Sequence, residues 1–528
     1  MVGRALRIAL TAAIVAFGAA PVAAKTLRWS ATGDASTQDP HAEAELFTQI
    51  ANQQVYDALV RYDTKLGLSP SLATEWKATG PRTWVFRLRR GVKFSDGTPF
   101  TADDVVFSYE RASSSGSTYK LYARQAGKPR RIDDYTVEFT NDAPNPVEPA
   151  TVTNIFIMSR AWCEKHRTTK PQDYAHDEET YSARHAMGTG PYKLVSYEPG
   201  VKSIYEKNPD WWGIRAGLFT GNADRVVYRP IVSPATRMAA LRSGEIDFVL
   251  DPPVQDVPRL MRDPSMRVLT GDENRVIFIG LDEWRDQLLY SDVKGRNPFR
   301  DRRVRLALYQ AIDIEALKKS VMRGLSTPTG IPLPTLANLP GVKDERYPFD
   351  LAASRKLLAD AGYPKGFAFT LHCPNDRYVN DEKICIALAG MWAKAGVRVN
   401  VDSAPKTLFF QRCERLDVSA YLVGWGGAAT DPIFTLKPIL HSRTKEGAGD
   451  SNFGDFRIPE LDALTDRIES EMDPAKREEM VRQAVAILKR DIPVLPLHRQ
   501  VIPWVMRAGV EVTHRANNTP LIYTVRMP

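Results

Sequence analysis

A loop near residue 375 carries side chains suited to binding a polar or anionic ligand. It reads Cys373-Pro-Asn-Asp-Arg-Tyr-Val-Asn380 and follows an apolar stretch typical of a strand. The guanidinium of Arg377 can form paired hydrogen bonds with a carboxylate or a phosphate, and the ring of Tyr378 can stack on a flat group. Asn375 and Asn380 can each donate and accept hydrogen bonds. The loop therefore predicts a ligand contact, with an ordinary surface loop as the alternative for Arg377.

Motifs for catalysis or cofactor binding are absent from the sequence. It contains no G-x-S-x-G elbow, no H-E-x-x-H pair, no Walker A loop and no complete G-x-G-x-x-G pattern. Gly188-Thr-Gly190 precedes a strand instead of a helix, so it predicts a turn. The 8 histidines are scattered, and the 4 cysteines lack metal-ligand spacing. We predict a protein that is not an enzyme and holds no metal or cofactor. A secreted hydrolase is the less favoured alternative.

The elements that must position these residues alternate between strand and helix. Ser233 followed by Pro234 predicts the start of a helix, and Gly244 predicts its end. Apolar segments typical of strands flank this helix. The same order returns in residues 351–424, which favours an α/β fold with a partly parallel sheet. The C-terminal region adds two amphipathic helices and a strand-like segment, 494–505, that we expect to return to an earlier sheet.

The first third of the chain shows one clear helix start and one region without periodicity. Thr101-Ala-Asp-Asp104 is a capping box that predicts a helix over 105–112, because its hydroxyl and carboxylate can satisfy free amide groups. Residues 113–130 are rich in Ser and Gly and predict a surface loop.

Length and composition indicate a large exported globular protein. The 528 residues allow about three packed units, and 43% apolar with 25% charged residues is typical of a soluble chain. Residues 1–24 combine Arg4 and Arg7, a short apolar stretch and Val22-Ala-Ala24, which predicts a cleaved signal peptide. The formal net charge of +8 is dispersed, so we expect no nucleic-acid partner.

Export to an oxidising compartment makes one or two disulfides plausible. The cysteines are Cys163, Cys373, Cys385 and Cys413. Pairing of Cys373 with either Cys385 or Cys413 is favoured, and the sequence does not fix which pairing forms.

Several longer motifs resemble one family along almost the whole chain. They include Trp84-Val-Phe-Arg-Leu-Arg-Arg-Gly-Val-Lys-Phe-Ser-Asp-Gly-Thr-Pro-Phe100, Gly188-Thr-Gly-Pro-Tyr192, Asn208-Pro-Asp-Trp-Trp212 and Thr236-Arg-Met-Ala-Ala-Leu-Arg-Ser-Gly-Glu-Ile-Asp247. In this order they resemble the family 5 extracellular solute-binding proteins, which are the dipeptide, oligopeptide and nickel receptors of ABC importers.

The resemblance implies a periplasmic binding protein type II-like α/β fold, with two lobes, a hinge and an extra N-terminal subdomain. It maps lobe I to residues 25–60, 186–285 and 497–528, the subdomain to 61–185 and lobe II to 286–496. The two hinge strands would lie near Ile277 to Leu281 and Pro496 to Ile502.

The resemblance also implies site residues, and one of them departs from the family pattern. Trp425 is expected to form an aromatic wall of the pocket. Peptide receptors of the family have an Asp three residues after this Trp, which pairs with the ammonium of the peptide, but this chain has Ala428. Loss of the Asp would leave a closed-in ammonium without a counter-charge. Asp431 could replace it if the loop runs differently.

Two further site residues come from the lobe I segment that the resemblance aligns with the cleft. They are Glu45 and Phe47, and a core helix explains Phe47 equally well. The resemblance thus predicts a monomeric periplasmic receptor that delivers a peptide or peptide-like solute to an ABC permease of the inner membrane. A receptor for an opine, an oligosaccharide or another polar or anionic compound is the alternative, and nickel is less favoured.

Overall fold

The computed structural model describes residues 24–173, 179–334, 339–426 and 430–528. The predicted signal peptide, except for its last residue, lies outside the described residues, as does Ala428. Within the described ranges, no helix combines the length and the apolar character needed to cross a bilayer.

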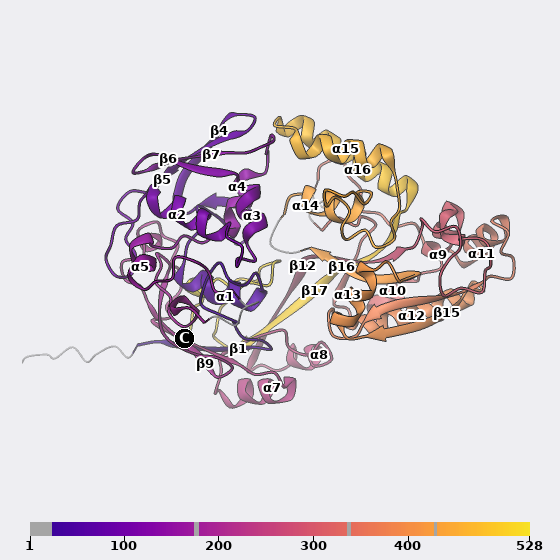
Figure 1. The fold of residues 1–528 in the computed structure, drawn as a ribbon. Coiled ribbons are helices and arrows are strands. Elements are labelled where there is room, and N and C mark those ends of the chain that lie inside the picture. Colours follow the sequence, from indigo (N-terminus) through magenta and orange to yellow (C-terminus); the bar gives the residue numbers. More distant parts are fainter. Residues whose placement is uncertain (1–23, 174–178, 335–338, 427–429) are drawn as a thin grey trace, which may run out of the picture.

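One sheet of 11 strands runs through both halves of the molecule (Figure 1). The strand order is β15 (Arg398–Ala404), β14 (Ala368–Pro374), β16 (Ala420–Gly426), β12 (Met266–Leu281), β17 (Val494–Arg507), β11 (Phe248–Leu250), β1 (Thr26–Ala31), β10 (Arg225–Pro230), β9 (Lys202–Lys207) and β8 (Tyr192–Glu198), with β13 (Ser326–Pro328) paired to β17. β1 is parallel to both of its neighbours, and β14 is parallel to β15 and β16. The partly parallel sheet confirms the predicted α/β fold.

Two long antiparallel strands, β12 and β17, connect the two halves. They pair from Met266 opposite Arg507 to Gly280 opposite Val494, and their register shifts between Asp272 and Val276. The first part of β12 lies in the half that contains β11, and the second part pairs with β16. The C-terminal segment therefore does return to the sheet as predicted, and the expected hinge segments fall within these two strands.

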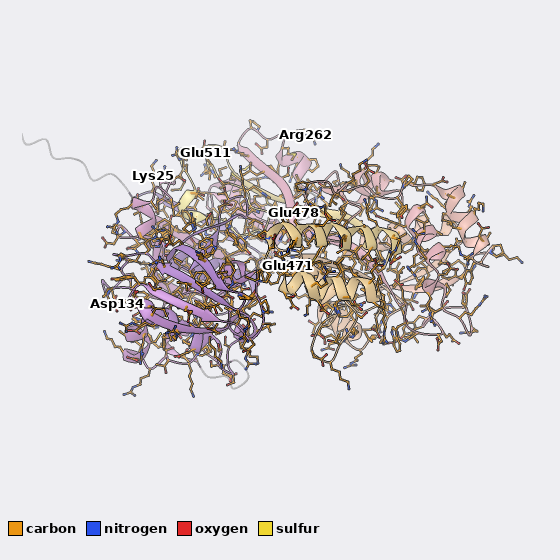
Figure 2. All side chains as sticks on the ribbon, turned by 90° about the horizontal axis from the view of Figure 1, so that it is seen from above. Lys25, Asp134, Arg262, Glu471, Glu478 and Glu511 are labelled. Carbon is orange, nitrogen blue, oxygen red and sulfur yellow. The ribbon has the colours of Figure 1, made fainter. Side chains whose placement is uncertain are left out.

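Helices cover the sheet in both lobes. Those of lobe I are α1 (Leu46–Val55), α6 (Trp212–Arg215), α7 (Pro234–Ser243) and α8 (Val257–Leu260). Those of lobe II are α9 (Arg302–Gln310), α10 (Ile314–Ala316), α11 (Leu351–Asp360), α12 (Asp381–Lys394), α13 (Lys406–Glu414), α14 (Ile433–Thr435), α15 (Pro459–Ser470) and α16 (Pro474–Asp491). Seen from above, the ends of α15 and α16 near Glu471 and Glu478 point toward the other half of the molecule (Figure 2).

The subdomain contains its own antiparallel sheet. Its strand order is β4 (Ala73–Gly80), β5 (Thr83–Leu88), β7 (Thr136–Thr140) and β6 (Lys128–Asp133), and β2 (Val60–Tyr62) pairs with β3 (Leu68–Pro70) beside it. The helices are α2 (Ala102–Ala112), α3 (Lys120–Gln125), α4 (Glu148–Thr151) and α5 (Arg160–Lys165). The predicted surface loop over 113–130 was wrong, because it contains α3 and the buried side chains of Tyr119 and Ala123.

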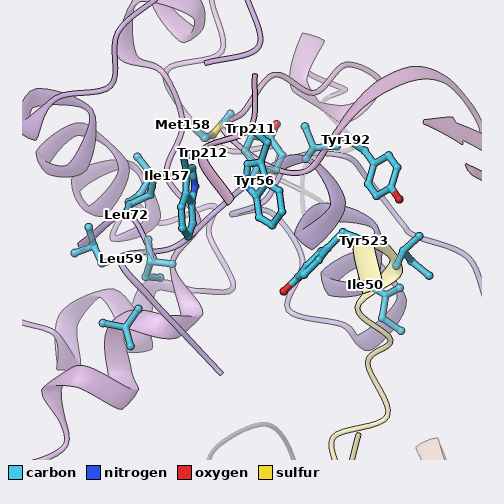
Figure 3. Close-up of a cluster of buried hydrophobic side chains, with 14 of the residues drawn as sticks. Ile50, Tyr56, Leu59, Leu72, Ile157, Met158, Tyr192, Trp211, Trp212 and Tyr523 are labelled. Atoms are coloured by element: carbon cyan, nitrogen blue, oxygen red, sulfur yellow. The ribbon is translucent and has the colours of Figure 1, made fainter. Parts of the chain in front are cut away.

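Lobe I and the subdomain share one continuous hydrophobic core, whereas lobe II has separate cores. Trp211, Trp212, Tyr56 and Tyr523 lie in the shared core together with residues of the subdomain (Figure 3). A buried ion pair also crosses this junction. Asp39, in the loop after β1, accepts hydrogen bonds from Arg111 of α2 at 2.8 and 2.5 Å, and both side chains are 0% exposed.

All 4 cysteines are free and buried, so the predicted disulfide is not formed in the structure. The thiols of Cys373 in β14 and Cys385 in α12 contact each other. One of the two favoured pairs is therefore adjacent in space but not joined by a disulfide. Burial and the neighbouring Cys373 thiol raise the pKa of Cys385, which keeps its sulfur protonated.

Candidate ligand-binding site

A cavity of about 240 Å³ lies in lobe II against the middle of β12 and the end of β16. Trp425 and Tyr378 line it, and both rings are held in place by main-chain acceptors. The indole of Trp425 donates to the Phe434 carbonyl at 2.8 Å, and the Tyr378 hydroxyl donates to the Gly424 carbonyl at 3.1 Å. These bonds occupy the polar atoms of both side chains, so the rings can offer their faces to a ligand.

Two arginines add positive charge to the same cavity. Arg275 of β12 places its guanidinium 5.8 Å from the centre of the Tyr378 ring, and Arg377 lies 5.2 Å from that centre. Burial alone would lower the pKa of Arg275, but the carboxylate of Glu273, 3.1 Å away, raises it above its ordinary value. Arg377 is exposed, and no carboxylate in the described part of the chain forms an ion pair with it. The cavity can therefore take an anionic group.

The other polar residues of the predicted loop point elsewhere. Asn375 is exposed and does not line the cavity, and its main-chain amide donates to the Ala404 carbonyl at 3.1 Å. Asn380 precedes α12 with a φ of 57°, and its side-chain amide donates to the Val321 carbonyl at 2.9 Å. The structure thus brings together Arg377, Tyr378 and Trp425, while neither asparagine lines the cavity.

Asp431, the expected substitute for the missing carboxylate, is bound within the protein. Its two oxygens accept hydrogen bonds from Arg477 of α16 at 2.6 and 2.7 Å, and its Oδ1 also accepts from the Ile433 amide. Ala428, which the sequence resemblance aligns with the ammonium-binding Asp of peptide receptors, lies outside the described residues. Glu414 at the end of α13 is the carboxylate among the described residues that line this cavity.

Glu45 and Phe47 lie in lobe I at the start of α1. The carboxylate of Glu45 accepts hydrogen bonds from the amides of Phe47 and Thr48 at 2.8 and 3.2 Å, which caps the helix. Burial raises the pKa of Glu45. The ring of Phe47 covers Gly33 so closely that a Cβ there would lie 2.3 Å from it. Neither residue lines the lobe II cavity.

A second cavity, of about 140 Å³, lies in lobe I beside the subdomain. Arg61, Asp57 and Arg515 line it together with aromatic side chains. Sequence reasoning missed Arg61, Arg275 and Arg515, because they are single arginines in strands or irregular segments without a motif. Only the pairing of β12 with β17 and the packing of the C-terminal segment show that they border cavities. No cluster of three metal-ligating side chains occurs among the described residues.

Two lobes joined by paired strands, with cavities on both sides of the junction, define the class of two-lobed solute receptors. The model of the bacterial extracellular solute-binding proteins, family 5 Middle, matches residues 67–447. The chain belongs to this family of extracellular proteins. It is therefore a solute-binding component of ABC importers and not an enzyme.

Relatives with named ligands align over most of the chain. The heme-binding protein A of Haemophilus influenzae is 28% identical over 481 residues, which cover 85% of this chain and 82% of the relative. The glutathione-binding protein GsiB of Pectobacterium atrosepticum is 26% identical over 496 residues, covering 92% and 90%.

Solved structures share the fold. The structure of HbpA2 from Haemophilus parasuis superposes with a TM-score of 0.80 at 23% identity, covering 95% of this chain and all of that one (100%). A dipeptide-binding protein from Pseudoalteromonas in complex with Met-Leu gives a TM-score of 0.73 at 22% identity, with coverage of 96% and 100%. At these identities the likeness supports the fold alone.

Proposed function

We propose that this chain is a monomeric periplasmic receptor, exported by its signal peptide, that captures a peptide or peptide-like solute and delivers it to an inner-membrane ABC permease without binding nucleic acid. In this proposal, lobe I consists of residues 25–60, 186–285 and 497–528, the subdomain of 61–185 and lobe II of 286–496. The solute lies between the lobes, and rotation about β12 and β17 closes them on it.

The observation that carries the proposal is the lobe II cavity beside the junction of the lobes. Its fixed aromatic rings, Trp425 and Tyr378, offer flat apolar surface, and Arg377 offers charge for a carboxylate. The guanidinium of Arg275 lines the same cavity and is paired with Glu273. Asn375, Asn380, Glu45 and Phe47, the other side chains predicted to contact the ligand, do not line this cavity. Glu414 is the candidate partner for a ligand ammonium.

A peptide-like solute with free carboxylates fits this lining best. Glutathione is such a solute, since it carries two carboxylates and one ammonium, and it is the ligand in the names of several relatives. A non-peptide anion such as an opine is the second candidate. It is favoured by one specific observation, the engagement of Asp431 by Arg477, which leaves this carboxylate unable to bind an ammonium.

Calorimetry against a panel of solutes tests the proposal. The panel contains glutathione, di- to pentapeptides, an opine, an oligosaccharide and a nickel salt, and unchanged ligand is verified afterwards by mass spectrometry. We expect binding of a carboxylate-bearing peptide or peptide-like solute without turnover. Binding of the opine alone would favour the second candidate, and hydrolysis of a peptide would contradict a pure receptor.

A further inference from the structure

The lobe I cavity of about 140 Å³ lies where the subdomain meets lobe I and the C-terminal segment. β2 and the residues just after α1 form one side of it, and residues of the segment 515–523 form the other. Aromatic rings, including those of Tyr56, Trp211 and Tyr523, surround this region (Figure 3). The lining also contains polar side chains, among them Gln49, Gln53, Asn154 and Asn517.

Arg515 is a buried cation without a counter-charge in the described part of the chain. Its side chain is 3% exposed and donates to the carbonyls of Tyr62, Asp63 and Thr519 at 3.0, 3.1 and 3.0 Å, and to the Thr519 hydroxyl at 2.9 Å. All these acceptors are neutral. The Nε–H of Arg515 has no acceptor among the described residues. Burial lowers the pKa of Arg515 to about 10, so the guanidinium is still charged at neutral pH.

A second guanidinium, that of Arg61, lines the same cavity. Its Nη1 donates to the Tyr523 hydroxyl at 2.9 Å and its Nε to the Pro70 carbonyl at 3.2 Å. The charge of Arg61 contributes to the lowered pKa of Arg515, which shows that the two cations are close enough to repel each other. Two like charges that lie close together are each stabilised by a nearby anion.

The carboxylates nearest to these arginines have other partners. Asp57 accepts hydrogen bonds at Oδ2 from the Trp212 indole at 2.8 Å and from the Thr189 hydroxyl at 3.0 Å. Asp63 accepts at Oδ1 from the amides of Lys65 and Gly67, both at 2.8 Å. Among the described residues, neither carboxylate forms an ion pair with Arg61 or Arg515. Burial raises the pKa of Asp57 to about 6 and the charge of Arg61 opposes that rise, while the charge of Asp63 opposes the lowering of the pKa of Arg515 by burial.

An uncommitted hydroxyl completes the set of donors. The side chain of Ser71 is 1% exposed and lines the cavity, and its Oγ has no hydrogen-bond partner among the described residues. Leaving a buried donor or charge unsatisfied costs about 1–3 kcal/mol or more, so an unexplained set of this kind calls for a ligand.

We propose that this lobe I cavity binds an anionic group, a carboxylate or phosphate, through Arg515 Nε, Arg61 and Ser71. The anion comes from one of two sources, the transported solute itself or a free small anion. The neighbouring loop connects the cavity to the lobe junction, because the Asn274 amide of β12 donates to the Ala516 carbonyl at 2.6 Å. This anion site does not depend on the identity of the solute proposed above.

Calorimetric titration of the purified full chain with inorganic phosphate, and separately with glutathione, tests this site. Arg61→Gln removes one charge at the cavity, and Arg61→Lys keeps the charge. The matched control is Arg82→Gln, because Arg82 is an exposed arginine of the subdomain that donates to the Asp142 carbonyl and does not line the cavity. We expect phosphate binding that Arg61→Gln weakens about tenfold or more and that Arg61→Lys partly restores. Arg82→Gln should leave it unchanged.

Competition separates the two sources of the anion. If glutathione binding weakens in the presence of phosphate and in Arg61→Gln, the solute supplies the anion. If phosphate binds but does not compete with glutathione, a free anion occupies the cavity. Absence of phosphate and glutathione binding, or equal affinities in wild type and Arg61→Gln, would overturn the site. Trp425→Ala should impair the lobe II cavity without changing the affinity of the lobe I cavity for phosphate. A failure of the proposed receptor function can therefore be distinguished from a failure of the anion site.

Discussion

The lobe II cavity depends on individual side chains whose polar atoms are already satisfied. Trp425 and Tyr378 bind main-chain carbonyls of their own lobe, so their rings do not need a ligand to be oriented. Arg377, by contrast, gains a strong acceptor only when an anion is present. Preordered rings beside an uncommitted cation favour a solute that is partly flat and carries a carboxylate.

Replacing Trp425 by Ala should abolish solute-dependent stabilisation while the protein stays folded. The indole is half-buried, so the loss of its contacts and of one hydrogen bond should lower the free energy of unfolding by about 1–3 kcal/mol. The measurement is thermal unfolding with and without the solute that binds best in the panel. A full solute-induced shift in the variant would place the pocket elsewhere.

His498 provides a pH-dependent prediction at the same scale. Burial and the neighbouring Arg346 lower the pKa of His498 from 6.5 to about 3. Between these values the unfolded chain binds a proton that the folded protein does not. The contribution of neutral His498 to the free energy of unfolding is therefore complete above pH 6.5. It is lost progressively as the pH falls toward 3.

The comparison with His498→Met isolates this contribution, because all other titrating groups are common to both proteins. On acidification below pH 6.5, wild type should lose about 1.4 kcal/mol per pH unit more than the variant. Urea unfolding at several pH values measures the difference. Parallel stability curves for the two proteins would contradict the buried neutral state of His498.

At the scale of elements, local signals predicted helix ends well where side chains supply the caps. Thr101 and Asp104 form the predicted capping box of α2, and Ser233 caps α7, which Gly244 ends with a φ of 81°. α3 was missed because its six residues depend on packing around Tyr119 and Ala123 and have no clear periodicity of their own.

The Gly188-Thr-Gly190 motif predicts a turn, but it does not explain why the turn needs two glycines. A Cβ at Gly190 would lie 2.5 Å from the main chain of Val55, and the Thr189 hydroxyl binds Asp57. The motif is thus required by the close approach of this turn to the end of α1. Its glycines were predictable as a turn, but their partner segment, more than a hundred residues away, follows only from the tertiary structure.

Gly426, the last residue of β16, should be intolerant of a side chain. It has a φ of 155°, and a Cβ there would lie 1.8 Å from the Asn274 carbonyl oxygen of β12. Gly426→Ala should therefore push β16 away from β12, cost about 1–3 kcal/mol and weaken solute binding, since Arg275 is paired opposite Gly426. Chemical denaturation and calorimetry measure the two effects.

Gly390→Ala is the matched control for this substitution. Gly390 lies on an exposed turn of α12, and a Cβ there would meet no atom within 4 Å. The control should gain about 0.5–1 kcal/mol, because alanine lowers the conformational entropy of the unfolded chain. If both variants bind solute with wild-type affinity, the β16 and β12 contact does not shape the site.

At the scale of the whole molecule, the two lobes are joined by more than β12 and β17. Val254 and Val257 of lobe I pack with Leu325 of lobe II and Val501 of β17. In addition, Val147 of the subdomain packs against a core of lobe II, and Tyr62 lies beside Thr430. The sequence resemblance predicted two lobes, but contacts between such distant segments have no local signal.

Closure of the lobes should be visible in solution. Val147 and Tyr62 make few contacts with lobe II, so thermal motion should separate the lobes in the free protein. A solute bound to both lobes adds interactions that only the closed form can make. The radius of gyration from small-angle X-ray scattering should therefore fall when the best-binding solute of the panel is added. Trp425→Ala should show no change under the same conditions. Calorimetric binding without any compaction of the wild type would mean that the solute selects a shape the free receptor already has, and that β12 and β17 do not act as a hinge.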